Sequence, residues 1–118
     1  MAETVQLLTT YAESIATRDW TRLRAVLADT TVVTLLHTGE QYDADGFVAF
    51  NRDYDGGWVF TADEVVDGGE RGVLRAHVEL EGETFHVATF ASLDATSDRL
   101  TDLVEVWTEA VSPHPARG

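Results

Sequence analysis

Hydrophobic positions near the start of the chain recur every three or four residues, the spacing that places side chains on one face of a helix. This pattern predicts an amphipathic helix over residues 3–18. Its apolar positions are Val5, Leu8, Ala12 and Ile15, with Leu7 and Tyr11 at the margins of the stripe. Asp19 is a suitable cap for a second, short helix over residues 20–27, and Asp43 or Asp45 for a third that ends near Tyr54.

β-branched and aromatic residues become frequent after this region, in runs separated by turn-forming residues. They predict four strands, over residues 58–66, 72–80, 83–93 and 99–108. One earlier strand is predicted over residues 30–37, and residues 39–43 form either a loop or a short second strand. Helices followed by an antiparallel meander indicate an α+β domain. We expect one domain over residues 1–111 and a flexible tail over residues 112–118.

The last predicted strand places one carboxylate among apolar side chains. Alternate residues of a strand share a face, so Leu103, Glu105 and Trp107 point to the same side of the sheet. A carboxylate in such surroundings is either a functional acid or base or an unusual structural charge. Because burial disfavours the ionised form, we expect a raised pKa for Glu105 and a group able both to accept and to donate a proton.

The 118 residues carry a formal net charge of −13, and all eight basic residues are arginine. A surface this acidic repels nucleic acids and anionic membranes, so neither is an expected partner. No apolar run approaches the ~20 residues that span a bilayer, and we expect a cytoplasmic protein. The chain has no cysteine, and its acidic residues and histidines lack the spacing of a zinc or calcium site. We therefore expect no metal and no cofactor.

Several short segments carry a resemblance to a known superfamily. They are Tyr11, Ala16–Trp20, Leu27–Asp29, Gly46–Asn51 and Leu103–Trp107. They resemble parts of the nuclear transport factor 2-like proteins, among them ketosteroid isomerase, SnoaL-type polyketide cyclases and limonene epoxide hydrolase. The stretch 50–54 and the chain's Glu-x-Trp ending resemble a SnoaL-like subgroup of small proteins without a settled activity. The resemblance implies a cone-shaped fold, with three N-terminal helices packed on a curved, mostly antiparallel sheet that encloses a pocket.

The same resemblance assigns roles to individual positions. The tyrosine that donates to the substrate oxygen in ketosteroid isomerase falls on Tyr11, whereas its general-base aspartate falls on Leu35 and its partner acid on Ala91. Steroid isomerisation by that machinery is therefore not implied. Cyclase and hydrolase relatives often place an acidic residue on the last strand, facing the cavity, and Glu105 occupies that position. The additional arginine and aspartate pair of the epoxide hydrolase has no match.

Strand alternation in this alignment predicts a mostly apolar pocket, with Leu80 and Phe85 also on inward faces. Its expected lining residues are Trp20, Leu35, Phe50, Tyr54, Trp58, Leu74, Ala76, Val78, Val87, Thr89, Ala91, Leu103 and Trp107. The expected catalytic residues are Glu105 as acid or base, Tyr11 as a hydrogen-bond donor, and His37 near the mouth as a base or orienting group. Each also has a structural interpretation: a satisfied carboxylate, a core tyrosine and a surface histidine. Asn51 is expected in solvent.

These features predict a cofactor-free SnoaL-like enzyme with acid–base chemistry of the isomerase, cyclase or hydrolase type. Its substrate would be an apolar, oxygenated small molecule such as a polyketide or terpenoid intermediate. The alternative is a non-catalytic small-molecule-binding or dimerisation module of the same fold. Val73, His86 and Phe90 are expected on the outer face of the sheet among charged side chains. Such a face suits a sheet-to-sheet homodimer, which relatives of this fold often form.

Overall fold

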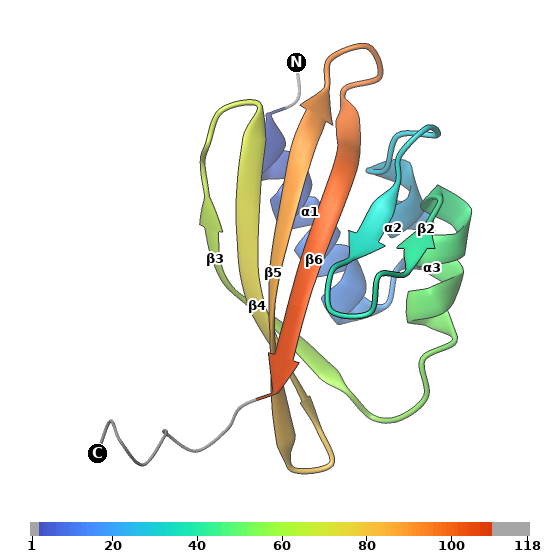
Figure 1. Cartoon of the computed structure of the whole chain (residues 1–118), viewed down its shortest axis with the longest axis vertical. Helices are drawn as coiled ribbons and strands as arrows, with labels where there is room; N and C mark the ends of the chain where they lie inside the picture. The colour runs from blue at the N-terminus through green and yellow to red at the C-terminus, as the bar shows by residue number, and fades with distance from the viewer. Residues whose placement is uncertain (1–2, 110–118) are drawn as a thin grey trace.

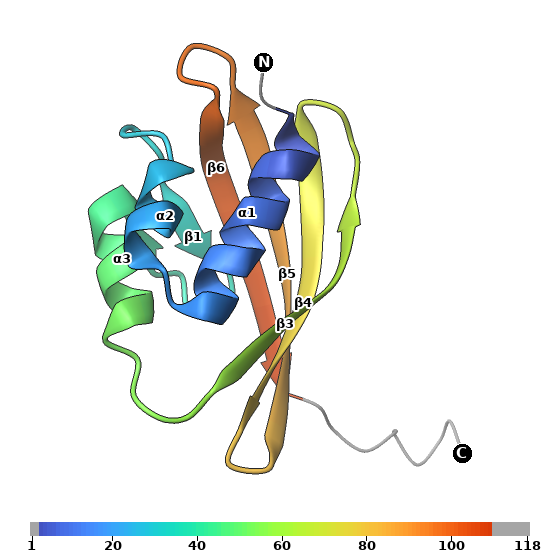
Figure 2. The same ribbon diagram turned by 180° about the vertical axis from the view of Figure 1, so that it is seen from behind.

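The computed structural model describes residues 3–109, so the predicted tail over residues 112–118 and the domain limit at residue 111 lie outside the described residues. It contains three helices, α1 (Thr4–Thr17), α2 (Trp20–Ala25) and α3 (Ala44–Arg52). They pack against a six-stranded, mostly antiparallel sheet, which confirms the predicted α+β class. Figure 1 shows the sheet in front of α1, and Figure 2 shows α1 lying across the opposite face.

Two aspartates begin the second and third helices, as the sequence predicts. Asp19 Oδ1 accepts a hydrogen bond from the Arg22 N–H at 3.1 Å, and Asp43 Oδ1 accepts one from the Gly46 N–H at 2.7 Å. Of the two candidate caps for α3, Asp43 is therefore the one used. α1 ends where Arg18 adopts a left-handed backbone conformation, with φ 58°, and donates its N–H to the Ile15 carbonyl at 3.1 Å.

The second and third helices end earlier than predicted. α2 stops at Ala25 rather than residue 27 because the next residue bonds to the sheet: the Val26 carbonyl accepts a hydrogen bond from the Leu100 N–H at 2.8 Å. α3 stops at Arg52 rather than near Tyr54. The glycine pair at 56–57 follows, and Gly56 has a φ of 104°, a conformation that a helix does not allow.

The sheet has the strand order β2-β1-β6-β5-β4-β3. Its long strands form the predicted meander: β3 (Val59–Val66), β4 (Arg71–Leu80), β5 (Glu83–Asp94) and β6 (Arg99–Glu109). β1 (Val33–Leu35) lies parallel to β6 and pairs on its other side with β2 (Gln41–Tyr42). The last strand in the chain therefore lies inside the sheet, between β1 and β5, which places its residues among both halves of the fold.

The early strand is shorter than the predicted range 30–37. The Leu35 carbonyl accepts a hydrogen bond from the Gly39 N–H at 2.8 Å, so the chain turns immediately after Leu35. Gly39 has a φ of 80°, which glycine adopts without steric cost. The turn leads directly into β2, so the second of the two alternatives for residues 39–43, a short strand, is the one observed. It also leaves His37 in an exposed turn rather than in a strand.

A β-bulge in β6 sets which side chains of that strand point inward. Val104 lies opposite Phe90 and Thr101 opposite Ser92, so β6 has one more residue than β5 between these pairs. The extra residue is accommodated at Asp102, whose φ is 51°. Leu100 and Leu103 are consequently both fully buried, although simple alternation would place them on opposite faces. Beyond the bulge the alternation continues normally, and Glu105 lies on the inward face.

Substitution of Asp102 tests the bulge. Both Asp102→Gly and Asp102→Val remove the contact of this carboxylate with Arg71, which is 3.5 Å long. In an ordinary strand valine is the more favourable residue. At a left-handed position the order reverses, because a β-branched side chain is strained there. We expect D102V to unfold with a free energy about 1 kcal/mol lower than D102G. Urea denaturation measures the difference, and a more stable valine variant would contradict the bulge.

Candidate functional site

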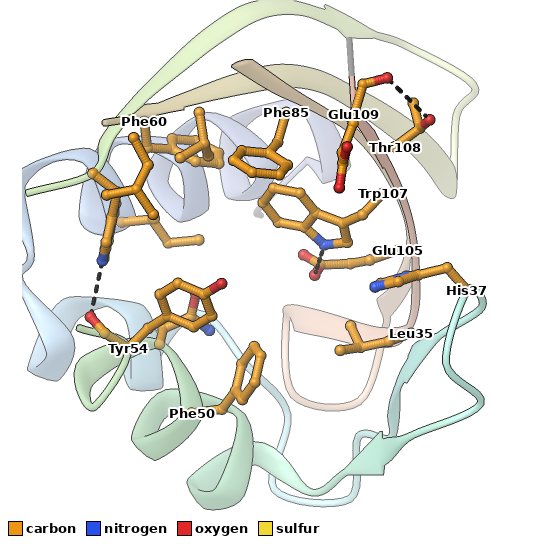
Figure 3. Close-up of a pocket in the computed structure, with 15 residues that line it drawn as sticks. Leu35, His37, Phe50, Tyr54, Phe60, Phe85, Glu105, Trp107, Thr108 and Glu109 are labelled. Atoms are coloured by element: carbon orange, nitrogen blue, oxygen red, sulfur yellow. Dashed lines mark hydrogen bonds between the residues drawn. The ribbon is translucent and has the colours of Figure 1, made fainter. Parts of the chain in front are cut away.

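A cavity with a volume of about 450 Å³ opens between the sheet and the region of α3. Aromatic and aliphatic side chains make most of its wall. The lining residues are Ile15, Leu35, His37, Phe50, Asn51, Tyr54, Trp58, Phe60, Val78, Leu80, Phe85, Glu105, Trp107, Thr108 and Glu109. Figure 3 shows rings from the sheet, Phe85 and Trp107, across the hollow from rings of the α3 region, Phe50 and Tyr54. A concave, mostly apolar site with a few polar groups is typical of small-molecule binding.

Glu105 is the buried carboxylate of this cavity, and its side chain is held by three donors. Its Oε2 accepts hydrogen bonds from the Tyr11 hydroxyl and from Thr89 Oγ1, the latter at 3.2 Å. Its Oε1 accepts from Trp107 Nε1 at 3.0 Å. The donors come from α1, β5 and β6, and only 4% of Glu105 is exposed. The central position of β6 in the sheet places Leu35 and Thr89 directly beside Glu105, on the two neighbouring strands.

Burial raises the pKa of the Glu105 carboxyl above its ordinary value, because the ionised form loses its hydration. The hydrogen bonds from Tyr11, Trp107 and Thr89 and the charge of His37 act in the opposite direction. Desolvation is the largest of these influences, so the net shift is upward. The carboxyl is therefore placed to exchange a proton nearer neutrality than a surface glutamate does.

Tyr11 supports Glu105 from beneath the cavity. Its ring is fully buried and stacks on Phe47, with 6.1 Å between the ring centroids. Burial, together with the neighbouring Glu105, raises the pKa of Tyr11 well above its ordinary value, so the hydroxyl keeps its proton and remains a donor. The hydrogen bond that this hydroxyl donates goes to Glu105. Tyr11 is not among the residues that line the cavity.

His37 and Glu105 lie on the same side of the cavity. His37 belongs to the turn between β1 and β2, and Figure 3 shows its ring beside Glu105. The residue is exposed at the mouth, as expected from the sequence.

Trp58 anchors the loop that follows α3. Its Nε1 donates to the Tyr54 carbonyl at 3.0 Å, and its own carbonyl accepts from the Arg18 guanidinium at 2.6 Å. The same guanidinium stacks on the indole, 3.8 Å from the ring centroid. These contacts fix a loop with two glycines, and so hold Tyr54 at the cavity although 54% of this residue is exposed.

The structure brings together only part of the residue set predicted for the pocket. Six of those residues line the cavity: Leu35, Phe50, Tyr54, Trp58, Val78 and Trp107. Seven others lie outside it: Trp20, Leu74, Ala76, Val87, Thr89, Ala91 and Leu103. The reason is that α1 covers much of the inner face and fills it with its own side chains, including Leu8 and Tyr11. Trp20 packs against Trp58, with 6.4 Å between centroids.

Several lining residues were absent from the predicted pocket set. They are Ile15, Asn51, Phe60, Leu80, Phe85, Thr108 and Glu109. Leu80 and Phe85 were expected on inward faces, and extending the alternation of β6 by one pair would have indicated Glu109. Asn51, expected in solvent, is half-buried and lines the cavity. Its Nδ2 donates to the Phe47 carbonyl, one turn earlier in α3, at 2.9 Å.

Within residues 3–109 no group of three histidine, aspartate or glutamate side chains is arranged to hold a metal ion. In the same residues, no helix has the length and apolar character needed to cross a membrane.

Comparisons with known proteins identify the fold. No protein-family model and no curated protein sequence matches the chain. A candidate ketosteroid isomerase from Kribbella flavida DSM 17836 is 23% identical, with a TM-score of 0.87, and the match covers 97% of this chain and 84% of that one. A candidate SnoaL-like polyketide cyclase from Shewanella denitrificans OS-217 is 18% identical, with a TM-score of 0.72, over 87% of this chain and 88% of the other.

A third similar structure is an LEH-like epoxide hydrolase from M. tuberculosis, 12% identical with a TM-score of 0.71, over 88% of this chain and 81% of that one. The chain has the nuclear transport factor 2-like fold. The predicted fold is thereby confirmed. At these identities the shared nuclear transport factor 2-like fold does not carry an activity with it.

The raised pKa of Glu105 predicts a pH-dependent effect of Glu105→Gln on stability. Between the ordinary and the raised pKa, the folded state binds more protons than the unfolded state, so the wild type loses stability as the pH rises through this window. The glutamine cannot ionise. We expect the unfolding free energy of E105Q, relative to wild type, to increase with pH and then level off. Urea denaturation across a pH series measures it; a pH-independent difference would contradict the raised pKa.

Proposed function

We propose that the protein is a cofactor-free acid–base catalyst that acts on an apolar, oxygenated small molecule bound in the cavity. The observation that carries the proposal is Glu105, a buried carboxyl with a raised pKa in the wall of an open cavity. A carboxyl of this kind is costly to bury, and such groups occur preferentially at functional sites. A polyketide or terpenoid intermediate has the size and character that the aromatic wall suits.

The chemistry begins with proton abstraction next to a substrate carbonyl. Ionised Glu105 takes a proton from the adjacent carbon, the C–H electron pair forms a C=C bond, and the carbonyl π pair moves onto the oxygen. Where this enolate is conjugated with a second double bond, the protonated carboxyl returns the proton to the far carbon and the product is an isomer. Where the enolate attacks a second carbonyl, a ring closes and the protonated carboxyl gives its proton to the new alkoxide. Tyr11 is a positioning residue here, because its hydroxyl is bonded to Glu105. His37, which lines the cavity, would be the hydrogen-bond donor to the oxyanion that develops on the substrate.

The fold neighbours support acid–base chemistry in general and leave its type open. Their names include a ketosteroid isomerase, a polyketide cyclase and an epoxide hydrolase. Leu35 and Ala91 are buried and apolar at the positions where ketosteroid isomerase has acids, which argues against steroid isomerisation by those groups. Cyclisation or isomerisation of a smaller ketone needs only the carboxyl that is present.

A non-catalytic small-molecule-binding module is the second candidate function. It is favoured by the apolar residues Leu35 and Ala91 at positions where ketosteroid isomerase has acids. It is also favoured by the three hydrogen bonds that Glu105 accepts within the protein. In that case the cavity binds a ligand without proton transfer. The two functions differ in whether bound ketones exchange protons with solvent. For either function we propose a small molecule bound in the cavity as the partner and the cytoplasm as the location.

Deuterium exchange tests the catalytic proposal without knowledge of the natural substrate. Wild-type protein in D₂O is expected to accelerate exchange at the carbon next to the carbonyl of apolar ketones of one to three rings, such as 1-tetralone, measured by NMR. Glu105→Gln keeps the shape of the side chain but cannot take a proton, so we expect a loss of about 100-fold or more. Tyr11→Phe leaves the carboxyl in place and should retain part of the activity with a shifted pH profile.

Glu70→Gln is a matched control, because it removes one negative charge from the loop before β4, at the opposite end of that strand from the cavity residues Val78 and Leu80. Its exchange rate should equal that of the wild type. If ketones bind but exchange their protons no faster than in buffer alone, the binding module is favoured. Equal rates for wild type and E105Q would remove Glu105 from the mechanism.

We further propose a homodimer formed through the outer face of the sheet. Apolar side chains are exposed on this side: Val106 of β6 is 38% exposed and Val66 of β3 47%, and Val32 and Leu36, which flank β1, are 45% and 58% exposed. Figure 1 shows this face without a covering helix among the described residues. Charged pairs lie beside the apolar residues, such as Arg75 with Glu64 at 2.8 Å. A second copy of the chain would bury this surface and leave the cavity free.

If the dimer exists, one of two aspartate substitutions should lower the molecular mass in solution and the other should leave it unchanged. Val106→Asp puts a charge in the proposed interface, so we expect the variant to be monomeric by light scattering at concentrations where the wild type is dimeric. Ala16→Asp introduces the same charge at an exposed position of α1, in the other layer, and should leave the dimer intact. A monomeric wild type would contradict the dimer. A dimeric V106D would show that the dimer contact lies elsewhere.

A further inference from the structure

The charges that line the cavity are predominantly negative. Glu105 and Glu109 belong to the wall, and within residues 3–109 no arginine lines it, while the whole chain has no lysine. His37 is the single lining residue in that range able to carry a positive charge. Arg18 stacks on Trp58 but is not a lining residue. An anionic ligand would therefore meet repulsion in this cavity without a compensating arginine.

Several donors of the wall are already used by the protein. Trp58 Nε1 bonds the Tyr54 carbonyl at 3.0 Å, and Trp107 Nε1 bonds Glu105 at 3.0 Å. Asn51 Nδ2 gives one of its two N–H groups to the Phe47 carbonyl at 2.9 Å, and Thr108 Oγ1 donates to the Glu109 carbonyl at 3.4 Å. The Asn51 Oδ1 and the Glu109 carboxylate are available as acceptors, so a ligand that donates hydrogen bonds finds partners in this wall.

Aromatic faces surround the same space. Phe85 and Trp107 come from neighbouring strands of the sheet, and Phe50 and Tyr54 face them from the α3 side (Figure 3). Glu109 lies directly opposite Phe85 in the pairing of β5 with β6, so a carboxylate and an aromatic ring are adjacent at the mouth. Aromatic rings attract cations through the negative charge of their faces, and a nearby carboxylate adds to this attraction.

We propose that the cavity binds an apolar amine, with its ammonium group held between the aromatic rings and Glu109 at the mouth. The proposal rests on the proposed function and narrows its substrate class: an oxygenated molecule that carries a positive charge. The cation at the mouth would orient the apolar body toward Glu105 at the deeper end. The strongly acidic surface of the chain favours the approach of such a ligand and disfavours anionic ones.

Two probes of nearly identical shape isolate the contribution of the charge. 4-Hydroxyphenyltrimethylammonium carries a quaternary ammonium group where 4-tert-butylphenol has a neutral carbon of the same substitution. Calorimetric titration of the wild type, in a slightly acidic buffer that keeps both phenols protonated, gives both affinities. We expect the cation to bind about tenfold more tightly. Equal or tighter binding of 4-tert-butylphenol, or absence of binding by the cation, overturns the proposal.

Two variants locate the binding of the cation. Phe85→Leu keeps an apolar side chain but removes the aromatic face, and Glu109→Gln removes the charge while keeping the length of the side chain. Each should weaken binding of the cation several-fold and leave the affinity for 4-tert-butylphenol unchanged. Glu70→Gln, which changes the net charge by the same amount at the far end of β4, should alter neither affinity. Equal effects of E109Q and E70Q on the cation would show an unspecific effect of net charge and overturn the site.

The outcome separates this inference from the proposed function. If 4-tert-butylphenol binds as well as the cation while the wild type still exchanges ketone protons in a manner that depends on Glu105, the ligand is neutral and the catalyst stands. If the cation binds preferentially but no ketone exchanges, the cavity is a binding site for amines and the catalytic proposal fails.

Discussion

The arrangement of this molecule depends on one carboxyl group that is removed from water but not from hydrogen bonds. Glu105 receives hydrogen bonds from three separate elements, and its burial can be tolerated only because those donors are in place. Tyr11 brings the first helix into this network, Thr89 the neighbouring strand, and Trp107 the wall of the cavity. The group is therefore a structural junction of α1 with the sheet and, in the proposed function, the acid–base group of the cavity.

That dual position follows from the order of the strands. β6 is the last strand in the chain but lies inside the sheet, with β1 parallel on one side and β5 antiparallel on the other. A residue in its middle is surrounded on both sides by neighbouring strands and covered by α1. The bulge at Asp102 lets the same strand direct Leu100 and Leu103 into the core. The far end of β6, past Glu105, leaves the cover of α1 and becomes the wall of the cavity.

The division of the inner face explains why the cavity holds a limited set of residues. α1 and α3 fill the part of the sheet near Leu74 and Leu103, where Tyr11 and Phe47 stack on each other. The open part lies where β4, β5 and β6 extend past the end of the helix. Its wall is aromatic and acidic at once, and this combination underlies both the proposed proton chemistry of Glu105 and the proposed preference for a ligand of positive charge.

The sequence by itself determined the three helices, the cap at Asp19, the four-strand meander and the inward parity of Glu105, because these depend on local spacing and capping. It limited the cap of the third helix to Asp43 or Asp45, and the structure shows that Asp43 is used. It did not determine the end of the early strand at Leu35, the parallel pairing of that strand with β6, or the bulge at Asp102, because these are decided by backbone bonds between distant segments. Tertiary packing also decided which inward residues line a cavity: Ala76 and Val78 share one face of β4, but only Val78 lines the cavity. Periodicity identifies a face, whereas open space along that face depends on how much of it the helices fill.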